Sequence, residues 1–361
     1  MIEKKLSYIK DWDEFISTVH SNGVFPLVYL TLKKYQDKIP LNILNYMKSI
    51  YMDIVKYNML LTSELINIMK LLEENDIKAI AFKGPTLAQI AYGDITLRQY
   101  VDLDILVDEK DLYNSAIILK SINIEPDLSL EFLKNDTLIK VGSDFNLFNK
   151  YTNIHLELHW NLFRKLLNEK RKDFISSNQL SVDINGKKIY TLDYNYLLIY
   201  LCVHGSKHLW ERIEWIMDLN KLISKGSFNW DFIINTSKEL KVYNMFLLGI
   251  SLTDELFNTE IPSSIKNDYK TNQKVNKLKN KILNLIDSQI MHQEKEKKIM
   301  ILKFKIIMQM FDSKIESFKY ILSVIFKPTH YDVYFINISK PFSFLYYLVR
   351  PIRLIFNLFK K

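Results

Sequence analysis

The sequence is poor in several residue types that define specialised classes of protein. It contains a single cysteine, Cys202, which excludes an internal disulfide framework and a metal site built from several cysteines. We interpret Cys202 as a small core residue. No linker rich in glycine or serine and no internal repeat interrupts the chain. No window of 18 or more apolar residues is free of charge, so we expect no membrane-spanning helix.

The remaining bulk features are those of a globular protein. The first residues, Met1–Lys5, lead into no apolar segment of the kind found in signal peptides, so we expect a cytoplasmic protein that is not exported. Apolar residues make up 48% of the chain and charged residues 25%, which argues against extensive disorder. A length of 361 residues allows two or three packed units.

Positive charge is concentrated in the C-terminal part of the chain. Residues 265–361 contain 19 Lys or Arg against 7 Asp or Glu, whereas the preceding 264 residues contain 30 against 34. A basic end on a slightly acidic body suggests an anionic partner, either nucleic acid or a membrane surface. A genomic bias toward Lys, Asn and Ile is the alternative explanation.

Hydrophobic spacing predicts an α+β fold in which a small mixed sheet is flanked by helices. The boundaries that we expect are an N-terminal helical segment (1–75), an α/β core (76–192), a larger C-terminal helical domain (193–340) and a basic apolar tail (341–361). Expected helices in and near the core are 86–92 and 109–121, the second with Leu112, Ala116, Ile117 and Leu119 inward. Expected strands are 77–82, 101–107, 138–141, 145–148 and 153–160. The dipeptide Asn185-Gly186 predicts a hairpin between 181–184 and 187–190. Prolines 262, 328, 341 and 351 are expected to divide the C-terminal helices.

Two acids alternate with aliphatic residues in the segment 101–107. Because side chains on a strand point to opposite faces with a period of two, Asp102 and Asp104 leave on one face while Val101, Leu103, Ile105 and Val107 are buried on the other. Paired carboxylates suit Mg²⁺, which takes one or two protein carboxylates and fills its other positions with water and substrate phosphates. This pattern indicates phosphoryl or nucleotidyl transfer.

A second strand carries another acid. In 153–160, Ile154, Leu156, Leu158 and Trp160 face one way, and His155, Glu157 and His159 face the other. Together with Lys83-Gly84 and Arg98, these acids resemble the nucleotidyltransferase superfamily typified by DNA polymerase beta. The string FKG-x-x-LA-x-x-x-YGD-x-x-x-R-x-x-x-DLDILV (residues 82–107) more closely resembles the bacterial family of uncharacterised nucleotidyltransferases of the NTP-transferase-5 type. It is also similar to nucleotidyltransferase toxins of abortive-infection systems. The segments 156–160 and 204–218 match that family too.

The resemblance implies a role for each residue of the motif. Asp102 and Asp104 would hold two magnesium ions, with Glu157 as third metal ligand or as the base that accepts the proton of the acceptor. The turn at Gly84 and Thr86 would bind the triphosphate. Lys83 and Arg98 would bind phosphate oxygens, one as a point charge and the other as a fork. Many superfamily members have Gly-Ser or Gly-Gly in this turn, whereas this chain has Gly84-Pro85, which removes one amide donor.

Structural roles are the alternatives for these residues. The two aspartates could form an exposed edge-strand face, and Glu157 could pair with Lys140 or His159. Arg98 could instead brace the aspartates. His204 and His208 are spaced for zinc, but zinc needs a third ligand and no Glu lies between them. We interpret them as structural, with a cleft-lining role beside Arg212 as the alternative.

The expected activity is transfer of a nucleoside monophosphate from a nucleoside triphosphate to an acceptor, with release of pyrophosphate. RNA or tRNA, a small molecule, and a peptide or glycan precursor remain open as acceptors. A non-catalytic nucleotide-binding or toxin–antitoxin-like protein is the first rival function. The second is a membrane-peripheral component of a cell-surface biosynthesis locus, anchored through 342–361, a segment that could otherwise pack on its own domain.

Overall fold

The computed structural model describes residues 2–126, 130, 133, 139, 142–163, 174–287 and 296–359. The strand expected at 138–141 lies outside these residues except for Ile139. No helix in the described ranges is both long enough and apolar enough to cross a membrane.

The chain begins with helices, as the sequence predicts. They are α1 (Ile2–Leu6), α2 (Trp12–Ser21), α3 (Phe25–Leu32) and α4 (Leu41–Glu74), with a 3-10 turn at Lys33–Lys38. The side chain of Asp11 accepts hydrogen bonds from the first free backbone N–H groups of α2 and so caps it. Leu61, Leu65, Ile68 and Leu72 form one buried stripe on α4, whereas Leu60 is exposed.

The central sheet has five strands in the order β1-β2-β5-β4-β3. Their bounds are β1 (Ala79–Ala81), β2 (Asp102–Val107), β3 (Ile124–Pro126), β4 (Asp144–Asn149) and β5 (His155–His159). The pair β2/β5 is parallel and the other three pairs are antiparallel. The sheet is therefore mixed, and together with the helices on both sides it confirms the α+β prediction.

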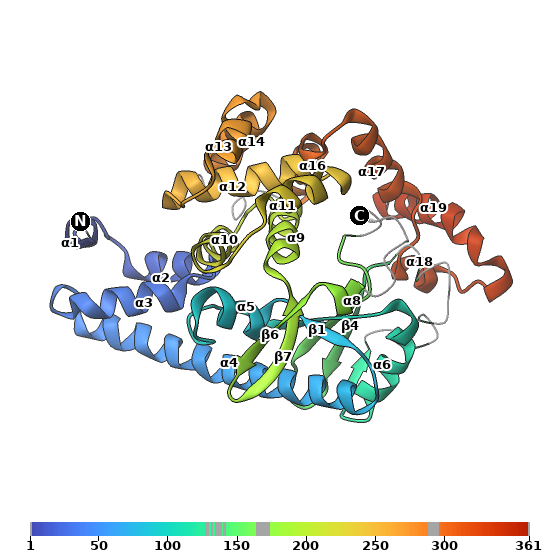
Figure 1. Cartoon of the computed structure of the whole chain (residues 1–361), viewed down its shortest axis with the longest axis horizontal. Helices are drawn as coiled ribbons and strands as arrows, with labels where there is room; N and C mark the ends of the chain where they lie inside the picture. The colour runs from blue at the N-terminus through green and yellow to red at the C-terminus, as the bar shows by residue number, and fades with distance from the viewer. Residues whose placement is uncertain are drawn as a thin grey trace.

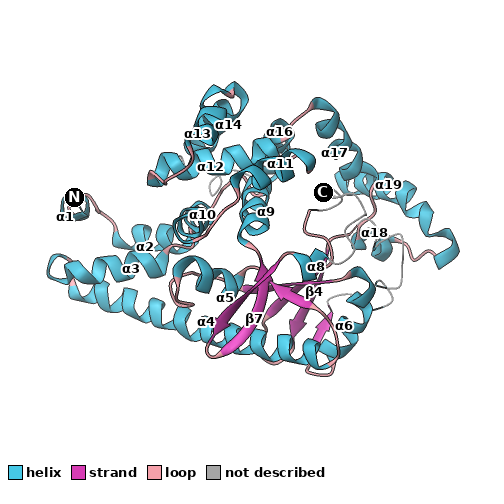
Figure 2. Cartoon of the chain, in the orientation of Figure 1, coloured by secondary structure: helices cyan, strands magenta, loops and turns pink. Residues whose placement is uncertain are grey.

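The two faces of the sheet pack on different layers, which Figures 1 and 2 show below and above the strands. Leu103, Ile105 and Val107 are buried with α4 and α6 (Leu112–Lys120) in one core. On the opposite face, Leu106 and Phe82 belong to the core of the C-terminal helices. The acids of β2 thus lie on the side that meets the second helical layer.

Two details of the predicted burial are wrong. Val101 precedes the paired part of β2 and is exposed, so the buried aliphatic row begins at Leu103. On α6, Leu112, Ala116 and Leu119 are buried but Ile117 is exposed. A residue that follows Ala116 directly is turned by about 100° around the helix, which places it on the outer face.

Short elements join the sheet to the helical layer. The turn after β1 leads into α5 (Gly84–Leu87), which continues as a π-helical segment over Ala88–Tyr92. A helix of four residues, α8 (Phe174–Ser177), precedes the hairpin of β6 (Gln179–Ile184) and β7 (Lys187–Leu192). Asn185 and Gly186 both have positive φ, as the predicted two-residue turn requires.

The rest of the described chain is helical. The helices are α9 (Tyr194–Lys207), α10 (Ile213–Lys225), α11 (Trp230–Glu239), α12 (Tyr243–Phe257), α13 (Ser263–Thr271), α14 (Gln273–Asp287), α16 (Glu296–Met310), α17 (Lys314–Phe326), α18 (His330–Phe335) and α19 (Tyr346–Phe359), with a 3-10 segment, η5, at Lys340–Leu345. Pro262 precedes α13 and Pro328 separates α17 from α18, as predicted. Pro351 is an exception, because it lies inside α19. Proline removes its own N–H donor but leaves the hydrogen bonds of neighbouring turns available.

Candidate active site

The parallel pair β2/β5 brings the predicted acids together. In its register Asp104 lies beside Glu157, and Asp102 lies beside His155. Partners in adjacent strands point to the same face of a sheet. Asp102 and Asp104 therefore share one face of the sheet with Glu157, which lies more than 50 residues further along the chain.

Asp104 is buried beneath two cationic side chains. Lys83 Nζ lies 2.6 Å from its Oδ1, and His159 Nε2 lies 3.2 Å from the same oxygen. Burial alone would raise the pKa of Asp104, but the charges and hydrogen bonds of Lys83 and His159 hold it well below the ordinary value. Burial alone would lower the pKa of Lys83, but the negative charges around it, that of Asp104 above all, together raise it. Asp104 is therefore ionised throughout the physiological range.

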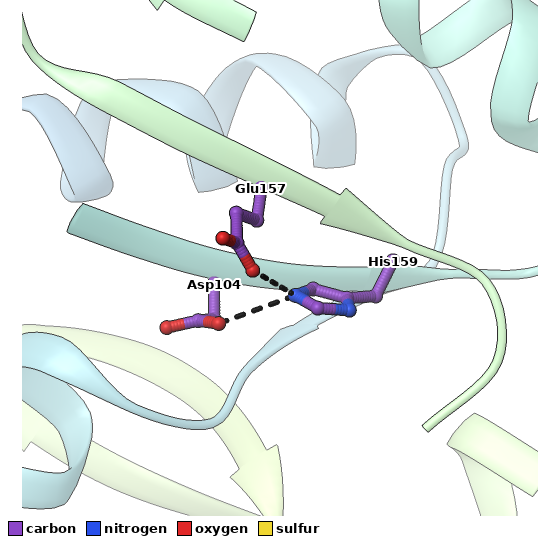
Figure 3. A group of neighbouring side chains, drawn as sticks. All are labelled: Asp104, Glu157 and His159. Atoms are coloured by element: carbon purple, nitrogen blue, oxygen red, sulfur yellow. Dashed lines mark hydrogen bonds and ion pairs between the residues drawn. The ribbon is translucent and has the colours of Figure 1, made fainter. Parts of the chain in front are cut away.

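His159 joins Asp104 to Glu157. Its Nε2 is 3.2 Å from Glu157 Oε2, and Figure 3 shows both carboxylates converging on this one nitrogen. Burial lowers the pKa of His159, but the hydrogen bonds to Asp104 and Glu157 raise it by more, to about 9. One ligand atom from each of these three residues lies within 4.8 Å of the others. The sequence suggests His159 only as a partner for Glu157, although the period of two along the strand places both residues on one face.

The donor set fits a divalent cation. Asp104 Oδ2 is buried and has no hydrogen-bond partner among the described residues. Burial, and then the negative charge of Asp104, raise the pKa of Asp102 to about 6. A cation would satisfy the orphaned oxygen and relieve the repulsion between the carboxylates. Carboxylate oxygens are the ligands that Mg²⁺ prefers.

The turn beside these acids depends on Gly84. Its φ is +51°, in the left-handed region that favours glycine, and an added Cβ would lie 3.2 Å from the carbonyl oxygen of Asp102. Thr86, predicted to bind nucleotide, is buried. Its hydroxyl lies 3.0 Å from the carbonyl of Ala81 and 2.7 Å from that of Lys83. The hydroxyl therefore holds the shape of the turn, and it could contact a nucleotide only if these hydrogen bonds broke.

A cavity of about 350 Å³ opens above the acids. It is lined from the sheet side by Lys83, Gly84, Asp102, Glu157 and His159, and from the helical side by Tyr200, His204, Lys207, His208, Arg212 and Trp215. The structure thus brings all three residues that were considered cleft-lining to the same cavity as the acids: His204 on α9, and His208 and Arg212 in the connection to α10. That cavity joins an anionic floor to a cationic and aromatic wall.

The family model described as "Uncharacterised nucleotidyltransferase" matches residues 9–258, more than half of the chain. The chain belongs to this nucleotidyltransferase family. One solved structure similar to it is the crystal structure of an antigenic nucleotidyltransferase-like protein from Paracoccidioides brasiliensis (15% identity, TM-score 0.39, 57% of this chain and 96% of that one). Another is the solution structure of the antibiotic-resistance factor ANT(2'')-Ia (9% identity, TM-score 0.33, 56% of this chain and 97% of that one). No curated protein matches.

The aromatic wall of this nucleotidyltransferase is a set of neighbouring rings, the His204–His208–Trp215 cluster. The ring centroids of His204 and His208 are 4.7 Å apart, and each is within 5.4 Å of Trp215. Tyr200 stacks on His204 at 5.9 Å and lies 5.8 Å from Lys83 Nζ. Burial, and then the charge of Lys83, hold the pKa of His204 well below its ordinary value, and burial also lowers that of His208. Both imidazoles are therefore neutral at pH 7.

Arg98, predicted to bind phosphate or to brace the aspartates, contacts other acids. Its guanidinium is buried and lies 2.9 Å from both oxygens of Asp218 and 2.8 Å from Glu214. Arg212 lies 2.6 Å from the second oxygen of Glu214, and Tyr92 donates a hydrogen bond to Asp218. Arg98 therefore fastens the core to α10. Glu214 was not predicted, because only the fold brings it to Arg98.

A second cavity, of about 400 Å³, also reaches the acids. Asp102 and Glu157 line both cavities, whereas Tyr57, Asn146, Asn153 and His155 line only the second. Among the described residues that line it, none is Lys or Arg. Two spaces with different linings therefore meet at a pair of carboxylates.

Proposed function

We propose that the chain is a magnesium-dependent nucleotidyltransferase that moves a nucleoside monophosphate from a nucleoside triphosphate to a small polar acceptor. The observation that carries this proposal is the pair of cavities that share Asp102 and Glu157. A transfer reaction needs two substrates held on either side of the reacting centre, within attacking distance of each other. The two cavities supply such an arrangement.

The first cavity suits the triphosphate. Lys83 supplies a positive charge beside the acids, and Lys207 and Arg212 supply further cations along the wall. The turn at Gly84 lets the backbone approach the phosphates closely. The His204–His208–Trp215 cluster offers neutral rings on which a nucleobase can stack. Arg98 also lines this cavity, where its contacts with Glu214 and Asp218 hold α10 in place.

The acids suit the metal. Asp102, Asp104 and Glu157 would hold the expected two magnesium ions, which when bound neutralise phosphate charge and lower the pKa of the attacking group. Glu157 is the candidate base, because its side chain is 36% exposed and lines both cavities. Its carboxylate would accept the proton of the acceptor. The acceptor oxygen or nitrogen then bonds to the α-phosphorus, the bond from that phosphorus to the α,β-bridging oxygen breaks, and pyrophosphate leaves.

The second cavity favours a small hydroxyl- or amine-bearing acceptor over RNA. Protein contacts to a nucleic-acid backbone are made largely by Lys and Arg. The polar residues around this cavity are instead acids, amides, a phenol and an imidazole, and its other lining residues are the apolar Val101, Leu147 and Leu156. Such groups suit sugars, alcohols and amines. Because the reaction consumes a nucleoside triphosphate, we place the enzyme in the cytoplasm.

The test uses each α-labelled nucleoside triphosphate with Mg²⁺ and a cell extract separated into small-molecule and RNA fractions. The parent protein should transfer label to the small-molecule fraction. Asp102→Asn should lower transfer by at least ~10³-fold, because a metal ligand is lost, while the far-UV circular dichroism spectrum stays unchanged. Asp53→Asn, on the exposed surface of α4, is the matched control and should leave transfer unchanged.

Three outcomes would count against the proposal. If Asp102→Asn were as active as the parent protein, the proposed metal site at Asp102 would be excluded. If label were found in the RNA fraction alone, the proposal that the acceptor is a small molecule would be wrong. Triphosphate binding without transfer to either fraction would favour a non-catalytic nucleotide-binding protein.

A further inference from the structure

The C-terminal lobe, residues 313–359, has charged groups inside. Asp332 is fully buried, and Arg353 Nε lies 2.6 Å from its Oδ1. Arg350 lies 3.6 Å from the other oxygen and donates a hydrogen bond of 2.9 Å to Thr329. Both arginines belong to α19 and both point toward α17 and α18. The inward side of α19 therefore carries its two arginines.

The outward side of α19 is apolar. The exposed fractions of its apolar side chains are 38% for Tyr347, 60% for Leu348, 50% for Ile352, 54% for Ile355 and 55% for Phe356. At 100° per residue these five positions span half of the helix circumference, opposite Arg353 and Tyr346. A helix that packs on a core in water has the reverse arrangement, with its apolar stripe inward. The exposed stripe therefore calls for a partner that is itself apolar.

Neighbouring elements of the lobe continue this pattern. Helix α19 packs on both α17 and α18, and Figure 1 shows the three grouped at the red end of the chain. Exposed apolar residues of these elements and of η5 are Ile315, Phe318, Leu322, Phe326, Tyr331, Tyr334, Phe335, Ile336, Phe342 and Phe344. Monomeric proteins rarely expose so many large apolar side chains in one region unless the region binds something.

We propose that the C-terminal lobe binds peripherally to an anionic membrane surface, with the outward face of α19 in the headgroup region. Aromatic and aliphatic side chains on one face of a helix, with cations around them, are typical of helices that lie in a membrane interface. No helix of the described chain is suited to span the bilayer. The lobe therefore lies on the surface rather than crossing it.

Charge favours a membrane over a protein partner. Residues 313–361 contain eight Lys or Arg against two acids. Of the two acids, Asp332 is buried against arginine, and Glu316 pairs with Lys319 at 2.9 Å. Each acid thus compensates a cation of the segment, and eight cations less two acids leave a net charge of +6. A net positive charge beside an apolar face is attracted to anionic lipid headgroups. This inference is independent of the proposed chemistry, because the lobe contributes no residue to either cavity.

The test is flotation of the full-length protein with two kinds of vesicle. One kind is phosphatidylcholine alone and the other is a phosphatidylcholine–phosphatidylglycerol mixture. We expect binding to the mixture, weaker binding in high salt and little binding to phosphatidylcholine alone. The double variant Ile352→Gln/Phe356→Gln should reduce partition at least ~10-fold, with the far-UV circular dichroism spectrum and the melting temperature retained. Leu256→Gln, at an exposed apolar site on α12, is the matched control.

Each remaining outcome overturns the proposal. Failure of the parent protein to float with the anionic vesicles would do so directly. Unchanged binding of the double variant would show that another surface contacts lipid. The parent protein could instead be a dimer in solution that binds no vesicles, with the double variant a monomer. That result would assign the face to a contact between copies of this chain. None of these results would bear on nucleotidyl transfer.

Discussion

Arg98 and Asp218, 120 residues apart, are joined by two parallel hydrogen bonds of 2.9 Å inside the protein. The same guanidinium reaches Glu214, so one cation compensates two buried acids of α10. The pair connects the loop before β2 to the helix that supplies Trp215 to the cavity wall. Arg98, Glu214 and Asp218 themselves line the first cavity, so this contact helps to form its wall.

Loss of Arg98 should destabilise the protein strongly. Arg98→Met removes the cation that two buried acids share, leaving Arg212 beside Glu214 and the Tyr92 hydrogen bond to Asp218. We expect a cost of about 3–5 kcal/mol in the free energy of unfolding. Urea unfolding followed by circular dichroism measures it. The double variant Arg98→Met/Asp218→Leu should cost less than the sum of the two single changes, because the residues interact directly. Lys56→Met, which breaks the exposed pair with Asp53, should cost less than about 1 kcal/mol. Additive single changes would contradict the assigned contact.

Gly84→Ala should lower kcat/KM in addition to a modest loss in the free energy of unfolding. The new Cβ adds backbone strain of about 1–2 kcal/mol at positive φ and also crowds the carbonyl of Asp102. Small displacements of a catalytic group are costly, so we expect at least ~10-fold lower kcat/KM. Gly186→Ala is the control, because its φ is +75° and a Cβ there meets nothing within 4 Å. It should reproduce the loss of stability without the loss of activity. Equal activity losses in both variants would argue against a role of this turn in catalysis.

The ring cluster should contribute to nucleoside binding but not to phosphate binding. His208→Ala removes a stacking surface beside His204 and Trp215, and stacking of a base on an aromatic side chain contributes about 1–3 kcal/mol. Equilibrium dialysis should therefore show at least ~5-fold weaker binding of a nucleoside triphosphate and unchanged binding of inorganic tripolyphosphate. His20→Ala serves as the control, because His20 is an exposed residue of α2. Equal weakening of both ligands would assign His208 to the phosphates.

Metal affinity should fall in mild acid. The pKa of Asp102 is raised from 3.8 to about 6, mainly by burial. Protons therefore bind the folded protein more tightly than the unfolded chain, and the resulting stabilisation of the metal-free protein is lost as the pH rises through about 6. Metal binding requires the ionised carboxylate, so affinity should decrease up to ~10-fold per pH unit below that value. Calorimetric titration with Mg²⁺ at about pH 5 and pH 7.5 measures the change. Equal affinities at the two values would contradict this assignment.

The local chemistry of the site could be predicted because it follows from short-range rules. The period of two along a strand places Asp102 and Asp104 on one face in any fold that contains the strand. A glycine at the end of β1 and the Asn185-Gly186 dipeptide mark turns for steric reasons that act within a few residues. The placement of Glu157 beside Asp104 is less local, since it also required β2 and β5 to pair in parallel.

The partners of these groups could not be read from the sequence. Lys83 and His159 both reach Asp104 because β1 and β5 flank β2 in the sheet. Arg98 contacts Asp218 and Glu214 because the loop before β2 meets α10. The sequence showed that the tail is apolar and basic, but which side of α19 faces outward depends on the contacts of its arginines with Asp332.

The sequence by itself determined which residues share a face, where turns occur and which chemistry the acids permit, because these follow from covalent geometry and side-chain type. The tertiary structure alone decided which charges compensate each other, which side of α19 meets solvent and where two cavities join. Those outcomes depend on distances between segments that are remote in the chain, and electrostatic and packing energies change steeply with such distances.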